Sequence, residues 1–184
     1  MYTANIVDTV MFRSLGKHPS PHLESLKRAV KAAGAELWVS ATIYRELANY
    51  GGSSPVNPYL DDAIEDGWVR VATPLPGVRS DTFDGVDDPV AEARHLADGF
   101  LNEASKYPVT NNWRDASVVA LAVGLFERNA RIRVITHTAD ESLATACVRI
   151  PPEFGYYDIA SRYYNPPQTA KHEFPTVDSL TWDG

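Results

Sequence analysis

The sequence Asn5-Ile6-Val7-Asp8-Thr9-Val10-Met11-Phe12 places one acidic residue inside a run of mainly apolar residues near the N-terminus. Such a run predicts a short, buried β-strand that contains an acid. A carboxylate in this position is unfavourable unless it is hydrogen-bonded, paired with a cation or bound to a metal ion. Asp8 therefore indicates either a metal site at this strand or a strand-end acid that accepts hydrogen bonds from the backbone.

Strands and helices alternate along the rest of the chain. Capping signals frame the predicted helices, as where Ser20-Pro21 begins a helix that Gly34 ends. This alternation predicts a mainly parallel sheet with helices on both faces, which is the α/β class. The further predicted strands are 36–40, 68–72 and 132–136. Four predicted helices span 21–33, 58–65, 89–104 and 116–126. Two more are a helix that Thr42 caps and Gly51-Gly52 ends, and a helix that begins at Asp140. Residues 73–88 are predicted to form a long loop.

The sequence changes character at Pro151. Pairs of prolines and tyrosines, such as Pro151-Pro152 and Tyr163-Tyr164, follow with little periodicity. Such a segment cannot fold alone, but its aromatic side chains can dock on a folded body. We therefore predict a domain over residues 1–150 and an aromatic, proline-rich C-terminal extension over residues 151–184, packed on the domain or on a second subunit.

Composition narrows the class of protein. The net charge of −7 and the pI of about 5.2 argue against a general nucleic-acid coat protein. A nuclease stays open, because bound divalent cations change the sign of the local field. The single cysteine, Cys147, excludes an internal disulfide and a cysteine-based zinc cluster. No apolar run approaches the roughly 20 residues that span a bilayer, and the N-terminus does not read as a signal peptide, so we expect a cytoplasmic protein without a membrane partner.

Four acids stand where a predicted strand ends or a predicted helix begins: Asp8, Glu46, Asp115 and Asp140. The carboxyl ends of parallel strands open onto one crevice, so we expect the four to meet there. Their charges would repel one another unless a divalent cation lay among them. Taken singly, each acid also has a structural explanation, such as the helix dipole for Glu46 and helix capping for Asp115 and Asp140. The metal-site hypothesis rests on their joint placement.

The order of these motifs resembles the PIN-domain family of ribonucleases, the family of VapC-type toxins. The resemblance covers roughly residues 4–150. It rests on Ile6-Val7-Asp8-Thr9, Arg45-Glu46-Leu47, Asp115-Ala116-Ser117-Val118-Val119-Ala120-Leu121-Ala122, and Val134-Ile135-Thr136 leading to Thr138-Ala139-Asp140. Thr136-His137-Thr138 occupies the place of the family's usual Thr-x-Asp, so Asp140 matches the last acid only when Thr138 is the matching threonine.

The resemblance implies a PIN-like α/β/α sandwich and a Mg²⁺- or Mn²⁺-dependent endoribonuclease. Asp8, Glu46 and Asp115 would hold one or two ions with Asp140 beside them, and the ions would activate a water for attack on phosphorus. The expected substrate is single-stranded or looped RNA, cut to 5′-phosphate and 3′-hydroxyl ends. Residues expected to contact it are Arg13, Lys17, Arg45, Arg114 and Thr138. Each basic residue taken singly is better explained as a surface charge, and Thr138 could instead orient a carboxylate.

Other hypotheses stay open beside the nuclease. A catalytically silent PIN-like module that binds RNA or a protein partner is favoured by the unusual segment from Thr136 to Asp140. A nuclease of this type could also be the toxin of a toxin–antitoxin pair, with an antitoxin protein as its partner. The aromatic C-terminal segment could form a homodimer contact, which the family often shows. An aspartyl phosphatase is disfavoured, because Val10 stands where a second acid is needed.

Overall fold

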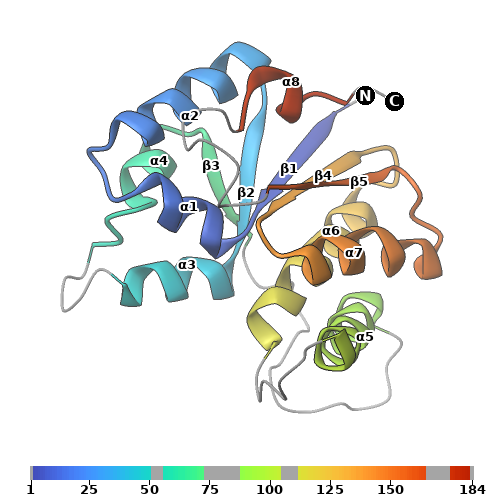
Figure 1. Cartoon of the computed structure of the whole chain (residues 1–184). Helices are drawn as coiled ribbons and strands as arrows, with labels where there is room; N and C mark the ends of the chain where they lie inside the picture. The colour runs from blue at the N-terminus through green and yellow to red at the C-terminus, as the bar shows by residue number, and fades with distance from the viewer. Residues whose placement is uncertain (1, 51–55, 73–87, 105–111, 165–174, 183–184) are drawn as a thin grey trace.

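A parallel sheet of five strands in the order β3-β2-β1-β4-β5 forms the centre of the computed structural model of this chain (Figure 1). Every neighbouring pair of strands is parallel. The structure describes residues 2–50, 56–72, 88–104, 112–164 and 175–182. The strands are β1 Thr3–Val7, β2 Glu36–Ser40, β3 Val69–Ala72, β4 Arg133–Thr138 and β5 Ile159–Tyr163.

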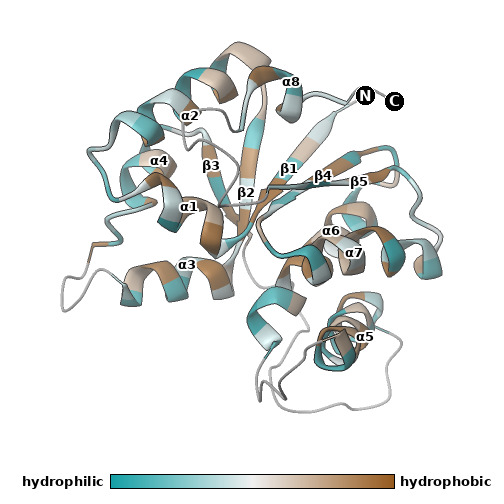
Figure 2. Ribbon diagram, in the orientation of Figure 1, coloured by the Kyte–Doolittle hydropathy of each residue, from teal (hydrophilic) through white to brown (hydrophobic). Residues whose placement is uncertain are grey.

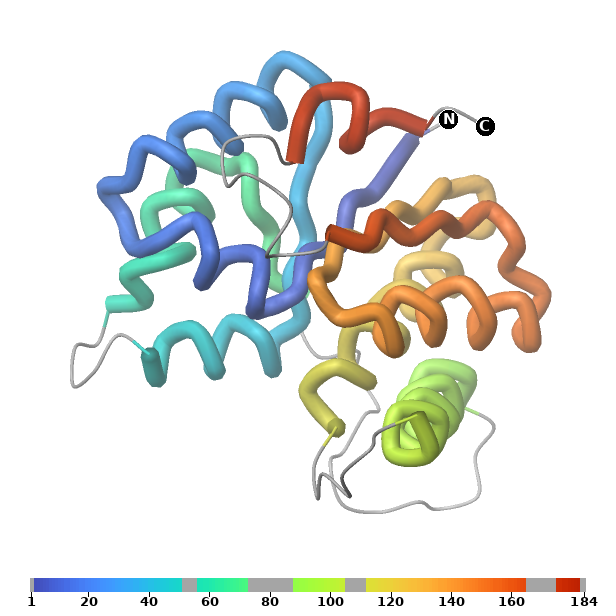
Figure 3. The backbone as a smooth tube through the Cα atoms, in the orientation of Figure 1, coloured from blue at the N-terminus to red at the C-terminus, as the bar shows by residue number. Residues whose placement is uncertain are grey.

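Helices cover both faces of the sheet. On one face lie α1, α2 and α4, and on the other lie α6 and α7, with α5 packed outside them (Figure 1 and Figure 3). This is the α/β/α sandwich that the sequence predicted, and the fold class is confirmed. The helices are α1 Thr9–Leu15, α2 Pro21–Ala33, α3 Ala41–Asn49, α4 Asp61–Glu65, α5 Pro89–Ala104, α6 Trp113–Arg128, α7 Glu141–Arg149 and α8 Val177–Leu180, with a 3₁₀ turn, η1, over Pro151–Phe154.

Amphipathic helices close the core against the sheet. Figure 2 shows hydrophobic and hydrophilic residues alternating along α3, whose buried residues are Ile43 and Leu47. Helix α6 differs, because nearly all of its residues from Ala116 to Phe126 are buried. It is a core helix, lying between the sheet and α5. An acid in its first turn therefore has little freedom to move away from the sheet.

The N-terminal strand is shorter than predicted. We expected strand structure to continue through Phe12, but β1 ends at Val7, and Thr9–Leu15 forms α1. The physical reason is the side chain of Asp8, which accepts the backbone N–H of Met11 and caps the helix. The apolar residues Met11 and Phe12 reach the core from one face of a helix rather than from a strand.

Two further details differ from the sequence predictions. Ser40 rather than Thr42 caps α3, since its hydroxyl accepts the backbone N–H of Ile43 at 3.1 Å. Beyond Pro151 we expected little regular structure, but β5 pairs with β4 and forms an edge of the sheet. The domain boundary at residue 150 stays a prediction. The predicted helix end at Gly51-Gly52 and nearly all of the predicted loop 73–88 lie outside the described residues. None of the described helices is long and apolar enough to cross a membrane.

Candidate metal centre

Asp8 is the residue at which β1 passes into α1. Its backbone N–H donates to the carbonyl of His137 in β4 at 3.2 Å, which fixes it at the carboxyl end of two neighbouring strands. Its Oδ1 accepts the N–H of Met11 at 3.0 Å, and only 3% of the residue is exposed. Burial raises the pKa of Asp8 to about 6, although hydrogen bonds from Thr138 and Met11 act in the opposite direction.

Thr138, the last residue of β4, joins two of the predicted acids. Its hydroxyl donates to Oδ2 of Asp8 and accepts the backbone N–H of Asp140 at 3.0 Å. Asp140 caps α7, where its Oδ1 accepts the N–H of Leu143 at 2.8 Å, and it is exposed. Thr138 is fully buried and its hydroxyl donates to Asp8, so in this structure it orients a carboxylate. Contact between Thr138 and substrate stays a prediction.

Glu46 projects from α3 and is held from two sides. Its Oε2 accepts the hydroxyl of Thr9 in α1 at 2.7 Å, and its Oε1 pairs with the guanidinium of Arg114 in α6 at 2.9 Å. The side chain is mostly buried. Two helices thus fix the Glu46 carboxylate beside the start of α6, the helix that carries Asp115 in its first turn.

Asp115 shows that the four acids lie together. Burial, and then repulsion by Asp140, Asp8 and Glu46 in that order, raise the pKa of Asp115 to about 6, while Arg114 acts in the opposite direction. The acids that follow β1 and β4 and the acids in α3 and α6 therefore act on one another at the carboxyl edge of the sheet. This is the edge at which the alternation of strands and helices placed them.

The four acids are close enough to repel one another, but as placed they do not form a complete set of metal ligands. In the part of the chain that the structure describes, no group of three or more His, Cys, Asp or Glu side chains is placed so that it could hold a metal ion. The two observations agree, because charges repel over distances well beyond a coordination bond of about 2.0–2.6 Å. A closed set would require side chains such as that of Glu46 to turn toward a common point.

A family model described as the halobacterial PIN domain matches residues 1–166. The chain belongs to the PIN-domain family. The resemblance that the sequence motifs indicated is therefore confirmed, and the matched region contains all four acids. PIN domains are generally nucleases, and they generally use divalent metal ions.

The PIN domain is also similar in structure to a chain in the crystal structure of VapBC2 from Rickettsia felis bound to a DNA fragment from their promoter. The sequence identity is 12% and the TM-score is 0.46, over 88% of this chain and 99% of that chain. A likeness of this size carries no functional argument.

The donor chemistry of the PIN domain fits a hard divalent cation. All four side chains are carboxylates, whose oxygens are the donors that Mg²⁺ and Mn²⁺ prefer. Burial is the largest cause of the raised pKa values of Asp8 and Asp115, and repulsion by neighbouring acids adds to it at both residues. Arg114 is the cation that acts on Asp115, and it is already paired with Glu46. A positive ion among the carboxylates would relieve this repulsion.

Two of the basic residues predicted to contact substrate lie beside the acids. Arg114 contacts Glu46 directly. Arg13 lies over the ring of Tyr50, with its guanidinium carbon 4.3 Å from the ring centroid, and Tyr50 in turn donates to Glu46 Oε1 at 3.5 Å. Both arginines are therefore connected to the acid cluster through Glu46.

The other two basic residues contact their own surroundings. The ammonium of Lys17 lies 5.9 Å from the ring centroid of Tyr59. Arg45 donates from Nε to the carbonyl of Ala41, one helical turn earlier, at 3.2 Å. Their contact with substrate, like that of Arg13 and Arg114, stays a prediction.

Sequence reasoning did not identify several residues that support the acids. Thr9 holds Glu46, and the hydroxyls of Ser40 and Ser117 lie 2.7 Å apart and connect the end of β2 to α6. Thr9 follows Asp8 directly and Ser40 ends an apolar strand, so both occupied positions that could have been noticed. Their partners are 37 and 77 residues away, and a single sequence does not reveal such pairings.

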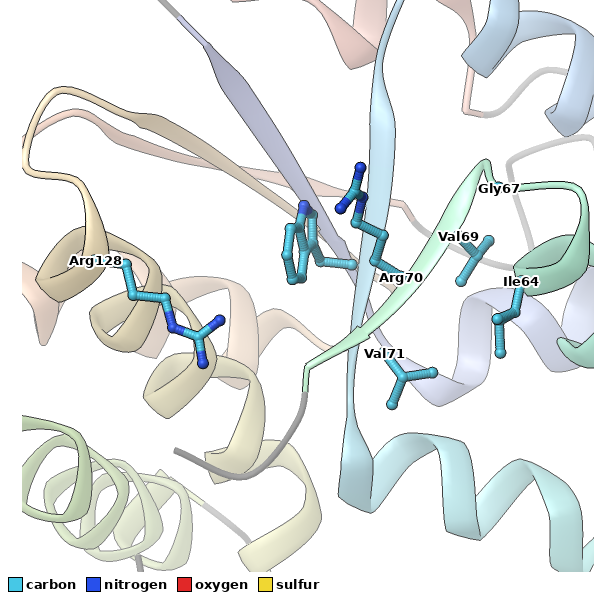
Figure 4. A pocket seen from close by; sticks show the side chains of 7 residues that line it. Ile64, Gly67, Val69, Arg70, Val71 and Arg128 are labelled. Atoms are coloured by element: carbon cyan, nitrogen blue, oxygen red, sulfur yellow. The ribbon is translucent and has the colours of Figure 1, made fainter. Parts of the chain in front are cut away.

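A pocket of about 410 Å³ lies apart from the acids, at the β3 edge of the sheet (Figure 4). It is lined by Trp38 of β2, by Arg70 and Val71 of β3, and by Arg128 at the end of α6, among others. The guanidinium of Arg70 pairs with Glu36 at 2.6 Å. None of the four acids contributes to the lining, so the pocket and the candidate metal centre are different places.

Proposed function

We propose that this PIN domain is a metal-dependent ribonuclease that hydrolyses RNA phosphodiester bonds at the acid cluster. The observation that supports it most is the environment of Asp115, whose pKa is raised to about 6 by burial and by Asp140, Asp8 and Glu46 together. Carboxylates that repel one another inside a fold destabilise it, and they persist where function requires them. Membership of a family of nucleases that generally use divalent ions supports the same reading.

Each residue at the acid cluster has a separate role in this proposal. Asp8 and Asp115 would be the principal ligands, with Glu46 and Asp140 beside them. A bound Mg²⁺ or Mn²⁺ supplies a Lewis acid that stabilises charge on the phosphate and lowers the pKa of water. Thr138 keeps the Asp8 carboxylate oriented by its hydrogen bond. Arg114, which pairs with Glu46 and is exposed, would offer a guanidinium to a substrate phosphate.

Cleavage of a labelled single-stranded RNA tests the proposal. We expect cleavage with Mg²⁺ or Mn²⁺, no cleavage with EDTA, and products with 5′-phosphate and 3′-hydroxyl ends. Asp8→Asn keeps the size of the side chain and removes its charge, so cleavage should fall by at least about 100-fold. Glu141→Gln is the matched control, because Glu141 is an exposed acid next to Asp140. Full metal-dependent cleavage by Asp8→Asn would overturn the proposal.

A second candidate is a catalytically silent PIN module that binds RNA or a protein partner. The observation that favours it is the open arrangement of the acids in the described residues, together with the Glu46–Arg114 ion pair. Crystals soaked in Mn²⁺ separate the two candidates by anomalous scattering. Manganese between Asp8 and Asp115 supports the nuclease, and an empty site under the same conditions supports the silent module.

A toxin role, an antitoxin partner, a homodimer and a cytoplasmic location stay predictions from the sequence. The toxin role has a direct test in growth after induced expression. Arrest by the wild-type chain but not by Asp8→Asn supports a toxin, and rescue by a neighbouring gene identifies its antitoxin. Equal growth of cells that express comparable amounts of both proteins contradicts the toxin role without bearing on RNA cleavage in vitro.

A further inference from the structure

An arginine and a tryptophan stack at the start of α6, beside the acids. The guanidinium carbon of Arg94, in α5, lies 3.6 Å from the ring centroid of Trp113, and its Nη2 donates to the Trp113 carbonyl at 3.2 Å. Trp113 is 38% exposed although it is a large apolar residue. It directly precedes Arg114, the partner of Glu46, and stands two residues before Asp115. Trp113 therefore stands in the first turn of the helix that carries Asp115.

A second pair of the same kind lies at the α1–α3 side of the cluster. Arg13 of α1 stacks over Tyr50 at 4.3 Å and donates to its hydroxyl at 3.4 Å. Tyr50 is 42% exposed, and its hydroxyl donates to Glu46 at 3.5 Å. Glu46 thus contacts Tyr50 directly and pairs with Arg114, the residue that follows Trp113 in the chain. Arg13 stands in α1 and Tyr50 directly after α3, whereas Arg94 and Trp113 stand in α5 and α6.

Positive charge gathers beside these rings. Burial lowers the pKa of Arg94 to about 10, and the nearby Arg45 of α3 acts in the same direction, while Asp98 opposes them. Two guanidiniums placed near each other form a favourable site for an anion. In a chain with a net charge of −7, arginines beside four carboxylates are the groups that can attract a polyanion to this edge of the sheet.

We propose that the Arg94–Trp113 and Arg13–Tyr50 pairs form a binding site for single-stranded RNA on either side of the acid cluster, with a base stacked on each exposed ring. Aromatic rings and arginines together are the combination that binds single strands, because every base offers a face for stacking and every nucleotide a phosphate. The bases of a duplex are already stacked on one another, so this site selects unpaired RNA. The inference rests on the proposed nuclease function and its expected substrate, and it adds three residues beyond those expected from the sequence: Tyr50, Arg94 and Trp113.

The chain contains a matched pair remote from the acids. Arg133 lies over the ring of Trp182 at 5.4 Å. Arg133 is the first residue of β4, so this pair stands at the opposite end of the strand from Thr138. Substitution of Trp182 removes an arginine-stacked tryptophan without touching the edge of the sheet that carries the acids.

Direct binding tests the proposal without relying on cleavage. The probe is a short fluorescent oligo(U), followed by anisotropy on the Asp8→Asn background in Mg²⁺, so that the RNA stays intact. Trp113→Ala should weaken binding about tenfold, since a stacked base contributes on that scale. Trp113→Phe should stay within about threefold of the parent, because the ring is kept. Trp182→Ala should leave binding unchanged, and a duplex of the same length should bind the parent and Trp113→Ala equally.

Salt dependence tests the arginine of the pair. Arg94→Gln should reduce the slope of log Kd against log salt by about 0.7, the loss of one phosphate contact on a single strand, and Arg133→Gln should not. Unchanged oligo(U) binding by Trp113→Ala, or equal losses in Trp113→Ala and Trp182→Ala, overturns the inference. Either result leaves the nuclease proposal standing, because that proposal fails on a different measurement, full cleavage by Asp8→Asn.

Discussion

At the level of single residues, Asp8 and Asp115 have pKa values of about 6 for partly different reasons. Burial is the larger cause for both, but hydrogen bonds from Thr138 and Met11 offset it at Asp8, whereas three other acids add to it at Asp115. Near neutral pH, therefore, the folded protein holds two carboxylates in their less favoured charged form. The candidate site destabilises the fold that carries it, as functional sites often do.

Asp115→Asn should stabilise the protein in a pH-dependent way. The folded pKa of about 6 exceeds the ordinary 3.8, so between these values the folded state binds the proton more tightly than the unfolded state. The stabilisation that proton binding at Asp115 gives the folded state is fully present below about pH 4 and is lost as the pH rises through 6. At pH 7 the substitution should raise the free energy of unfolding by about 1–3 kcal/mol.

Urea denaturation at pH 7 and pH 4 measures this effect of Asp115→Asn. The gain should shrink toward zero at the lower pH, where the wild-type carboxyl is already neutral. Glu141→Gln, which removes an exposed acid, should change little at either pH. A variant no more stable than wild type at pH 7 contradicts the argument.

Thr138→Val should damage the site and leave the outline of the side chain almost unchanged. Valine can neither donate to Asp8 Oδ2 nor accept the N–H of Asp140. Since the hydrogen bond from Thr138 lowers the pKa of Asp8, its loss should raise that pKa further, and the protein should lose about 1–3 kcal/mol. NMR titration of the Asp8 carboxyl measures the first effect and urea denaturation the second. Thr138→Ser keeps the hydroxyl and is the control; equal pKa values of Asp8 in the Val and Ser variants contradict this role.

At the level of helices and strands, elements with local end signals were predictable from the sequence. Helix α2 begins at Pro21 and is followed by Gly34, which takes the left-handed conformation with φ 59°. Helix α5 and strand β2 also have the predicted bounds. The failures lie where a short apolar run suits either structure: Val10-Met11-Phe12 was assigned to a strand, and capping by Asp8 makes it a helix. Strand β5, Ile159–Tyr163, has no strong alternation and depends on pairing with β4.

The candidate site was predictable in part for the same physical reason. Parallel strands present their carboxyl ends at one edge, so the acids after β1 and β4 and in α3 and α6 were expected to lie near one another. What a single sequence could not reveal is which side chain meets which. Glu46 contacts Arg114, 68 residues away, and Thr9, 37 residues away. Such contacts depend on how helices pack, and no periodicity encodes them.

Leu180→Ala should show that the short C-terminal helix α8 belongs to the core. Leu180 is 1% exposed, its carbonyl accepts the side-chain N–H of Asn5 at 3.2 Å, and α8 packs on α2. Truncation of a buried leucine should lower the free energy of unfolding by about 2–4 kcal/mol. Val177 in the same helix is 39% exposed, so Val177→Ala should change it by less than about 0.5 kcal/mol. Chemical denaturation compares the two; equal effects contradict a packed α8.

At the level of the whole molecule, a net charge of −7 and four acids at one edge of the sheet make cations the natural stabilising ligands. Monovalent salt screens this repulsion generally, over about 8–10 Å at ordinary ionic strength. A divalent ion that binds among the carboxylates acts on the folded state alone and stabilises it by mass action. The two effects can be separated because only the second depends on particular side chains.

Mn²⁺ should therefore raise the melting temperature of the wild-type PIN domain more than KCl of equal ionic strength does. At about 100 times the Kd the stabilisation is about 2.7 kcal/mol, which corresponds to a Tm increase of about 5–10 °C for a domain of this size. Asp8→Asn and Asp115→Asn each remove a ligand charge and should lose most of this increase, while Glu141→Gln should retain it. In KCl all four proteins should respond alike. A Mn²⁺ effect of equal size in wild type and Asp8→Asn would place the ion elsewhere on the acidic surface and contradict a metal centre at this edge of the sheet.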